Sequence, residues 1–518
     1  MLFNSYEFLF FFLPTVLAGF FLLSAGKWFR AAAAWLALAS IFFYGYWSPR
    51  YVILLMSSVG LNFAAGYAIA ARRQAGRQDQ ARAILIGALA ANLGTLAYFK
   101  YADFLINSIN VAAHSGLPLL HVILPIGISF FTFTQIAFLV DTYQGKVRES
   151  RFVPYVLFVT FFPHLIAGPV LHHSEMMPQF AHRETYRFNT ANFLVGTMFL
   201  VIGLVKKVVL ADGIQPFVAP VFDSAHGYAL TPIEAWGGVL AYTLQLYFDF
   251  SGYSDMAIGL AKMFNVDLPL NFNSPYKAAN ISDFWRRWHM TLSRFLRDYL
   301  YIPLGGNRKG PGRRYVNLMI TMLLGGLWHG AGWTFAIWGG LHGLFLVVHQ
   351  LWQSGLERLG HGIRPASSAG PHRAVGHVLA SALTFLSVVV AWVFFRASSL
   401  QSAIHVLEGM WRFDGVVLPL EWQAYWPPWW PSHGASVRFG ALDAFGGTRQ
   451  WEWIGALLAL AWFFPNSQQL ITGWRSRHPA ALRNAWAWVW LGALFAIVFL
   501  LAAINGSRGS SEFIYFNF

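Results

Sequence analysis

Long apolar runs recur from one end of this 518-residue chain to the other. Hydrophobic residues make up 56% of the sequence and charged residues only 11%, whereas soluble proteins carry about 25% charged residues. Because a helix needs about 20 residues to cross a bilayer, these runs predict a polytopic membrane protein. They lie at 8–24, 31–47, 51–71, 83–99, 121–140, 152–171, 192–211, 233–248, 316–328, 332–351, 376–395, 451–465 and 484–504.

The backbone of such a protein has to be helical where it faces lipid, since an unpaired amide in hydrocarbon costs several kcal/mol. A transmembrane barrel would instead show alternating segments of about ten residues. We therefore expect an all-α fold with about 11–13 transmembrane helices, and re-entrant or half helices where the runs are short. The run at 8–24 lacks a preceding basic segment and a small-residue cleavage site, so it is expected to be the first span.

The net charge of +14 is concentrated in a few loops. Positive charge marks the cytoplasmic side of a membrane protein, so we interpret this excess as topological and expect no nucleic-acid partner. Basic loops after the first and third runs predict an extracytoplasmic N-terminus. The basic loops 352–375 and 472–483 are then cytoplasmic, and the Trp- and Pro-rich loop 398–450 between them is extracytoplasmic. That loop either lies at the membrane interface or docks a partner.

The chain contains no cysteine. This excludes disulfides, thiolate metal sites and a cysteine acyl intermediate. We predict no metal site, and any acyl transfer has to use another group.

The stretch 283–342 concentrates the titratable residues of an otherwise apolar chain. His289 and His329 lie in apolar surroundings, and nine Lys or Arg residues lie between Lys277 and Arg314. Ionisable residues at membrane depth are costly and generally functional. We therefore predict that the active centre lies in this stretch.

A helix is expected to begin here at a cap formed by Asn280 or Ser282. If it is continuous, Arg286, His289, Ser293 and Arg297 share one polar, basic face. The glycine-rich segment 305–314 adds further cations, and Arg side chains with backbone amides make a good phosphate receptor. The alternative is that these charges only set topology. The candidate phosphate-binding residues are Arg286, Arg287, Arg294, Arg297, Arg308, Lys309 and Arg313.

His329 is the candidate general base. Glycines at 325, 326, 330 and 332 surround it, and small residues let helices approach closely and enclose the ring. An enclosed imidazole stays neutral and can accept a proton. His342 follows thirteen residues later, roughly on the opposite side of a continuous helix, so we expect it to be structural or to support the site from behind the catalytic residues.

Two other polar features are weaker candidates. His164 lies where Pro163 and Gly168 should break a helix, and a lone histidine there is more often structural. Asp249 and Asp255 are expected on either side of a turn at 251–254. They either line a cavity or each pair with a nearby arginine.

Several long motifs carry a family resemblance. They read PIGISFFTF at 125–133, FPHLIAGP at 162–169, QLYFDFSGYSDMAIG at 245–259, NFNSPY at 271–276, FWRRWHMTLSRFLRDYLYIPLGGNR at 284–308, GGLWHGAGWTF at 325–335 and FIYFNF at 513–518. With them the chain resembles the membrane-bound O-acyltransferase (MBOAT) family. Within it, the similarity is to the branch of the bacterial alginate O-acetyltransferase membrane subunit and its cellulose-acetylating relatives. Only 352–375 and 398–450 match poorly.

The resemblance implies an architecture and a pair of catalytic residues. It implies one MBOAT domain over 1–518 with a catalytic core at 124–343, and opposed cytoplasmic and extracytoplasmic funnels that meet at a histidine. His329 takes the place of the family's near-invariant histidine, and His289 that of its second polar residue.

The resemblance also implies substrates and a location. The acyl donor is acetyl-CoA from the cytoplasm, its phosphates held by the basic stripe, with no permanently bound cofactor. The acceptor is an exopolysaccharide, alginate- or cellulose-like, reached directly or through a periplasmic relay protein. The protein is expected in the bacterial inner (cytoplasmic) membrane.

Two alternatives remain open. A D-alanyl-type transferase of the same family would take its acyl group from a carrier-protein thioester rather than from CoA. A transporter or a non-catalytic scaffold of a polysaccharide machine would also bury charged residues in a helix bundle. A transporter would show flux without consuming acetyl-CoA.

Overall fold

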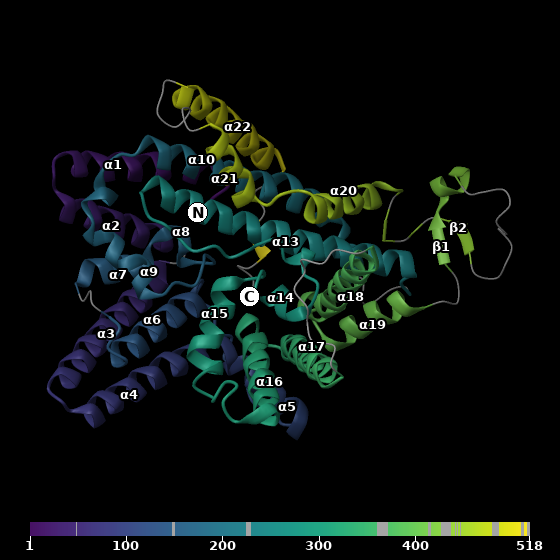
Figure 1. Cartoon of the computed structure of the whole chain (residues 1–518), viewed down its shortest axis with the longest axis horizontal. Coiled ribbons are helices and arrows are strands. Elements are labelled where there is room, and N and C mark those ends of the chain that lie inside the picture. Colours follow the sequence, from purple (N-terminus) through teal and green to yellow (C-terminus); the bar gives the residue numbers. More distant parts are fainter. Residues whose placement is uncertain are drawn as a thin grey trace. The chain divides into compact units, whose positions relative to one another are not determined.

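The computed structural model is almost entirely helical over the residues that it describes (Figure 1). The all-α prediction is confirmed. The described residues are 1–47, 49–147, 151–223, 229–359, 371–412, 416–425, 437–440, 442, 444–445, 447–478, 486–508 and 512–514.

Internal contacts divide the chain into two compact units. Unit 1 comprises Met1–Val208, Phe250–Asn271 and Ser467–Phe518, and unit 2 comprises Val209–Asp249 and Phe272–Asn466. The prediction of a single domain over 1–518 stays a prediction.

Unit 1 is built from helices of the N-terminal half and the C-terminal end of the chain. Its helices are η1 (Glu7–Phe12), α1 (Leu13–Ala25), α2 (Phe29–Trp47), α3 (Pro49–Gln74), α4 (Gln78–Leu96), η2 (Ala97–Tyr101), α5 (Ala102–Ala113), α6 (Ile128–Tyr143), α7 (Phe152–Thr160), α8 (Phe162–Leu165), α9 (His173–Met176), η3 (Met177–Ala181), η4 (Arg183–Tyr186), α10 (Thr190–Leu204), α21 (Ser467–Arg477) and α22 (Trp486–Arg508). The π-helical η5 (Val205–Ala211) and the long α13 (Pro232–Met263) continue from one unit into the other.

Unit 2 holds the stretch predicted to be the active centre. Its elements are α11 (Asp212–Ile214), η6 (Gln215–Phe217), α12 (Ala219–Phe222), η7 (Pro275–Lys277), α14 (Ile281–Trp285), α15 (Met290–Leu296), η8 (Arg297–Tyr301), α16 (Gly310–His329), α17 (Trp333–Arg358), α18 (Pro371–Arg396), α19 (Leu400–Trp411), β1 (Val416–Pro419), η9 (Leu420–Tyr425), β2 (Val437–Gly440) and α20 (Arg449–Phe463). Strands β1 and β2 pair in parallel, with Val416 opposite Val437.

Seven helical segments of the described chain are long and apolar enough to cross a membrane. This confirms a multi-pass membrane protein. The segments are Glu7–Ala25, Phe29–Trp47, Pro49–Gln74, Gln78–Ala113, Thr190–Phe222, Trp333–Arg358 and Val375–Arg396. The other predicted runs fall on shorter or more polar helices, including α6, α16 and α20, and the run 152–171 is divided between α7 and α8.

Glycines bring α10 and the C-terminal part of α13 into backbone contact within unit 1. A Cβ added at Gly196 would lie 2.6 Å from the carbonyl oxygen of Gly259, and one added at Gly203 would lie 2.6 Å from that of Gly252. Both pairs are seven residues apart on their helices, so the contact repeats every two turns. Small residues of this kind allow tight helix packing without a hydrophobic driving force.

A buried ion pair lies beside this glycine contact. Lys206 Nζ is 2.6 Å from Asp255 Oδ2 and donates to Ser467 Oγ at 2.7 Å, and that hydroxyl donates to the same carboxylate oxygen. The predicted turn between Asp249 and Asp255 is wrong, because α13 is continuous through both. One interpretation of the sequence was that Asp255 pairs with an arginine. Asp255 does have a charged partner, but the partner is Lys206.

Lys207, which follows Lys206, binds the backbone near the C-terminus. Lys207 Nζ donates to the carbonyl oxygen of Glu512 at 2.9 Å and lies 4.8 Å from the ring centre of Phe513. Tyr253 packs edge-on against the same ring, with centroids 4.8 Å apart. The start of the C-terminal FIYFNF motif is therefore fixed to unit 1, while residues 515–518 lie outside the described part of the chain.

Polar side chains inside α3, α4, α6 and α7 form one hydrogen-bonded chain in unit 1. The Tyr155 hydroxyl donates to Gln135, whose amide donates to Ser58 Oγ at 2.9 Å. Asn62, one turn on from Ser58, exchanges two hydrogen bonds of 3.2 and 2.6 Å with Asn92. Such bonds satisfy polar groups at membrane depth and lock the four helices in register.

The predicted extracytoplasmic loop 398–450 contains α19, β1, η9 and β2 in its described parts. Most of the Trp- and Pro-rich cluster on which that prediction rested, residues 426–431, lies outside the described residues. The loop's location therefore stays a prediction.

Replacing Lys206 by methionine should destabilise the protein, because it leaves the buried Asp255 carboxylate unpaired. Breaking a buried pair costs about 3–5 kcal/mol, so the apparent melting temperature in detergent should fall by several degrees. Adding Asp255→Leu should restore part of the lost stability, since the double variant has no buried charge without a partner.

Lys262→Met is the matched control. Lys262 also lies 2.6 Å from a carboxylate, that of Asp267, but the Asp267 side chain is 71% exposed. An exposed pair contributes about 0–1 kcal/mol. Equal melting shifts for the two methionine variants would contradict the structural role of the buried pair.

Candidate active site

His329 is the last residue of α16 and lies where the chain reverses. The backbone is extended at Gly330 and Gly332, and α17 begins at Trp333. Helices α16 and α17 then run side by side (Figure 1). Their backbones touch: a Cβ added at Gly339 would lie 2.3 Å from the carbonyl oxygen of Met322. This close approach holds the start of α17 against the His329 ring.

His289 lies at a break in the predicted basic helix. Asn280 caps α14 by accepting a hydrogen bond from the Asp283 amide at 2.8 Å, as predicted. The helix ends at Trp285, and His289 has a left-handed backbone with φ of +43°. The prediction of one continuous helix is wrong, so Arg286 does not share a helical face with Ser293 and Arg297.

The cause of this break is a long-range hydrogen bond. The carbonyl oxygen of Arg287 accepts from the amide of Asn273 at 2.9 Å, instead of from a residue further along a helix. The Arg287 side chain pairs with Asp283 at 2.9 Å, the predicted i,i+4 ion pair. The chain then turns, and His289 lies immediately before the next helix, α15.

The structure brings the two predicted histidines together. The ring centroids of His289 and His329 are 6.2 Å apart. Both are buried, with His289 fully inaccessible and His329 3% exposed. At this distance one substrate oxygen can lie within hydrogen-bond range, about 2.8 Å, of a nitrogen of each ring.

Aromatic side chains enclose His329. Trp338 and Phe395 pack edge-on against its ring with centroid distances of 5.1 and 5.3 Å, and Trp328 lies at 4.9 Å. Trp338 in turn stacks on Trp392 at 5.5 Å. These large side chains exclude water, so electrostatic and hydrogen-bonding interactions with a bound substrate are strengthened.

Burial sets the charge of His289, which lies outside the seven candidate membrane-spanning segments. Desolvation lowers the pKa of His289 to about 3. The ring is therefore neutral at physiological pH and can donate one hydrogen bond and accept another.

His342 lies close to this site, although a continuous helix would place it on the opposite side. Its ring packs against Trp338 and Trp285, with centroid distances of 4.8 and 5.1 Å. The prediction from a continuous helix fails because the chain breaks between α16 and α17. His342 is linked to His329 through Trp338, which contacts both rings.

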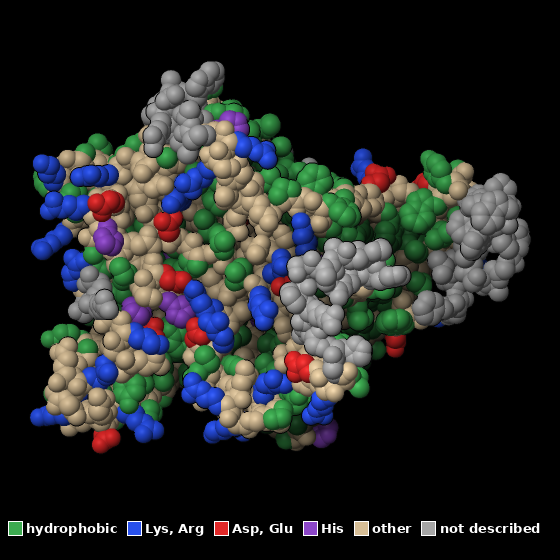
Figure 2. All heavy atoms as spheres, viewed as in Figure 1, with side chains coloured by type: hydrophobic (Ala, Val, Ile, Leu, Met, Phe, Trp, Pro, Cys, Tyr) green, Lys and Arg blue, Asp and Glu red, His purple; other side chains and the backbone are tan. Residues whose placement is uncertain are grey.

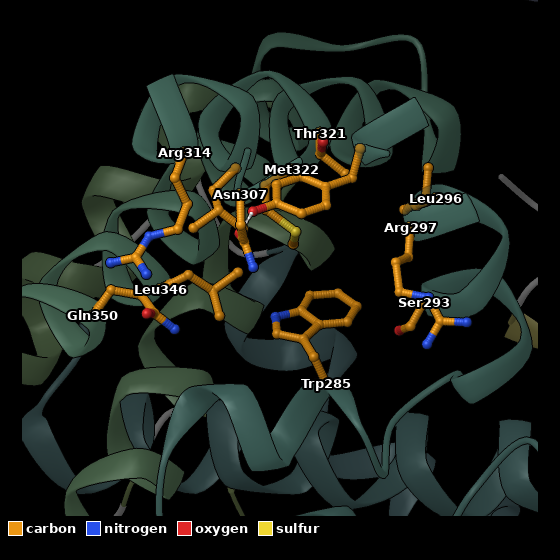
Figure 3. A pocket seen from close by; sticks show the side chains of 12 residues that line it. Trp285, Ser293, Leu296, Arg297, Asn307, Arg314, Thr321, Met322, Leu346 and Gln350 are labelled. Atoms are coloured by element: carbon orange, nitrogen blue, oxygen red, sulfur yellow. Dashed lines mark hydrogen bonds between the residues drawn. The ribbon is translucent and has the colours of Figure 1, made fainter. Parts of the chain in front are cut away.

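A pocket of about 280 Å³ opens beside the histidine site, between α14, α15, α16 and α17 (Figure 3). Its lining combines apolar side chains with two arginines and several uncharged polar groups. The lining residues are Trp285, Ser293, Leu296, Arg297, Tyr301, Asn307, Arg314, Leu318, Thr321, Met322, Leu346 and Gln350.

Few of the predicted phosphate-binding cations line this pocket. Arg297 does, and Asp298, 2.7 Å away, raises its pKa and keeps it charged. Arg314, which was not among the predicted residues, also lines it. Its Nε is buried without a hydrogen-bond partner among the described residues.

The other predicted cations lie outside the pocket lining. Arg287 is engaged by Asp283, and Arg294 is half-buried. The remaining four are exposed, and Figure 2 shows Lys and Arg side chains on the visible face around α15 and α16. These four are Arg286, Arg308, Lys309 and Arg313.

Sequence reasoning missed a buried histidine–carboxylate pair, which lies in unit 1. His173 Nδ1 is 3.0 Å from Asp141 Oδ2, with both side chains buried, and Lys146 lies 3.7 Å from the same carboxylate. The only local signal was the pair of histidines after the FPHLIAGP motif. His164 of that motif is buried in α8, and α7 ends just before it, as the predicted helix break requires. No cluster of His, Asp or Glu in the described chain could hold a metal ion.

Comparison with known proteins defines the class. The model of the membrane-bound O-acyltransferase family matches residues 20–368. The chain is 46% identical over 444 residues to the peptidoglycan O-acetyltransferase of Helicobacter pylori, covering 81% of each protein. It is 42% identical over 421 residues to the probable alginate O-acetylase AlgI of Pseudomonas aeruginosa, covering 80% of this chain and 75% of that protein.

A more distant relative is the teichoic acid D-alanyltransferase of Streptococcus thermophilus, 28% identical over 240 residues, or 44% of this chain and 57% of that protein. The fold and these similarities define a multi-pass membrane acyltransferase. The chain belongs to the membrane-bound O-acyltransferase family.

Gly339→Ala should disrupt the site without touching either histidine. The new methyl group would lie 2.3 Å from the Met322 carbonyl and 3.1 Å from the Gly326 Cα. Overpacking of this kind costs about 1–3 kcal/mol, and moving α17 shifts Trp338 away from His329. Acyl transfer should fall at least about tenfold, with a lower melting temperature.

The neighbouring Gly340→Ala is the control, because a Cβ there meets only the flexible end of Leu323 at 3.5 Å. It should retain activity and stability. Similar activities for the two alanine variants would show that the close helix contact does not position the site.

Proposed function

We propose that this protein is a membrane O-acetyltransferase. It takes acetyl groups from cytoplasmic acetyl-CoA and delivers them across the membrane to hydroxyls of a glycan. The observation that carries the proposal is the buried pair of rings, His289 and His329, 6.2 Å apart beside a pocket with two arginines. The names of the relatives support acetyl as the transferred group and a polysaccharide as the acceptor, either one such as alginate or one such as peptidoglycan.

His329 acts as the general base in the proposed mechanism. Its ring accepts the proton of the acceptor hydroxyl while that oxygen attacks the thioester carbonyl carbon. The tetrahedral intermediate collapses, the carbon–sulfur bond breaks, and the CoA thiolate leaves and takes the proton from His329. The products are the acetyl ester and free CoA, and no cysteine intermediate is needed in this cysteine-free chain.

His289 stabilises the developing charge. The low pKa that burial gives this ring keeps it neutral, so it acts through a fixed N–H rather than through a positive charge. A preorganised donor in a water-poor site favours the oxyanion of the intermediate over the ground-state carbonyl. The left-handed backbone at residue 289 holds the ring in place for this role.

The pocket beside α15 and α16 is the proposed donor site. Arg297 and Arg314 approach it from two helical elements and supply positive charge for phosphate groups. Acetyl-CoA is a substrate here, and the proposal includes no permanently bound cofactor. The exposed cations Arg308, Lys309 and Arg313 attract the donor at longer range.

The remaining predictions complete this proposal. Residues 124–343 form the catalytic core, and 398–450 face the extracytoplasmic side, where a periplasmic relay protein or the polymer docks. The N-terminus is extracytoplasmic and the protein lies in the bacterial inner membrane. D-alanyl transfer from a carrier protein is the weaker candidate, because the D-alanyltransferase relative matches less than half of the chain.

His329→Ala should abolish transfer while the protein still folds. Loss of a general base lowers rates by about 10²–10⁴-fold, and CoA-analogue binding should survive. His289→Ala should lose about 10²-fold, since it removes one oxyanion donor. The measurements are acetyl transfer and size-exclusion behaviour in detergent.

His377→Ala is the control, because this histidine is exposed on α18. A well-folded His329→Ala protein that kept more than about a tenth of wild-type transfer would contradict the proposal that His329 is the general base.

Charge reversal in the pocket should weaken donor binding. Arg297→Glu and Arg314→Glu should each raise the KM for acetyl-CoA about tenfold or more, since a charge-assisted hydrogen bond contributes about 1.5–3 kcal/mol. Arg308→Glu and Arg313→Glu, outside the pocket lining, serve as matched controls and should have smaller effects that vanish at high salt. Equal KM changes at all four positions would remove the pocket as the donor site.

A further inference from the structure

Trp285 stands between the pocket and the histidine pair. It is the last residue of α14, and one face of its indole lines the pocket. Its other side packs edge-on against His342 and Trp338, with centroid distances of 5.1 and 5.9 Å. Because Trp338 contacts His329 at 5.1 Å, ring contacts run from the pocket through Trp285 and Trp338 to the His329 ring.

The Trp285 indole also presents an unused hydrogen-bond donor. Its Nε1 is buried and has no hydrogen-bond partner among the described residues. Figure 3 shows this nitrogen turned toward the pocket. Buried tryptophan N–H groups usually find a partner, so the geometry calls for an acceptor oxygen supplied by a ligand.

The size of the pocket adds a second constraint. Its volume of about 280 Å³ lies at the lower end of ligand pockets. Met322 and Leu346 line it from α16 and α17. Trp285 is the lining residue whose ring contacts Trp338 and His342, on the side of the histidine pair.

We propose that Trp285 is a specificity-determining residue that limits the transferred acyl group to the size of acetyl. Its N–H binds a carbonyl oxygen of the pantetheine arm, and its ring blocks longer acyl chains from reaching His329. This inference rests on the proposed acetyl-CoA-dependent function. It explains why an acetyltransferase would keep a large indole between its donor pocket and its base.

The test compares acetyl-CoA with hexanoyl-CoA as donors for the purified protein. Wild type should strongly prefer acetyl-CoA. Trp285→Ala should raise the ratio of kcat/KM for hexanoyl-CoA over acetyl-CoA about tenfold or more, since pocket contacts discriminate by roughly 10–200-fold per methylene.

Trp285→Phe separates the two roles. It keeps most of the ring but lacks the N–H, so the acetyl preference should persist while the KM for acetyl-CoA rises severalfold. Trp333→Ala, an exposed tryptophan at the start of α17, should leave both quantities unchanged. If the alanine variant does not fold, Trp285→Leu replaces the indole with a smaller apolar side chain and allows the same comparison.

The outcomes distinguish this inference from the function on which it rests. A folded, active Trp285→Ala or Trp285→Leu protein with the wild-type preference for acetyl would overturn the size limit and leave the acetyltransferase intact. Wild-type protein that used hexanoyl-CoA as well as acetyl-CoA would also overturn it. Wild-type protein that released no CoA from either donor would instead refute the proposed function.

Discussion

The backbone contact between α16 and α17 is the constraint on which the site depends. Gly326 and Gly339 allow the two helices to touch at their backbones, and the turn between them places His329 at its apex. Helix α17 begins only four residues after His329. Trp338, in its second turn, therefore packs against the His329 ring. A side chain at either glycine would separate the helices and open the aromatic enclosure to water or lipid.

Burial then decides what kind of chemistry the site can perform. Desolvation keeps the buried His289 ring neutral, so the proposed pair of rings can pass a proton and stabilise an oxyanion without a metal or a thiol. The charges proposed to bind an anionic donor lie in an adjacent pocket, where Arg297 is exposed and Arg314 is half-buried. The proposed site therefore keeps its cations apart from the buried rings, where an unpaired ion would be costly.

Much of this arrangement could be predicted from the sequence because it depends on local patterns. The apolar runs predicted a helical membrane protein, the Asn280 cap and the Asp283–Arg287 pair follow from spacing alone, and the two histidines stood out against an apolar background. What the sequence did not reveal depends on contacts between distant residues. The Arg287 carbonyl oxygen accepts a hydrogen bond from the amide of Asn273, at the point where the expected helix is broken. Helix α13 continues through the expected turn, and its glycines at 252 and 259 pack against α10.

The most direct test of the central claim is transfer across a sealed bilayer. The purified protein would be reconstituted in liposomes with radiolabelled acetyl-CoA outside and a polysaccharide with a periplasmic extract trapped inside. In the molecules whose cytoplasmic face points outward, we expect release of CoA outside, with label appearing on ester-linked, base-labile acetyl groups inside. Failure of well-folded protein to release CoA, or label confined to the side of the donor, would contradict it.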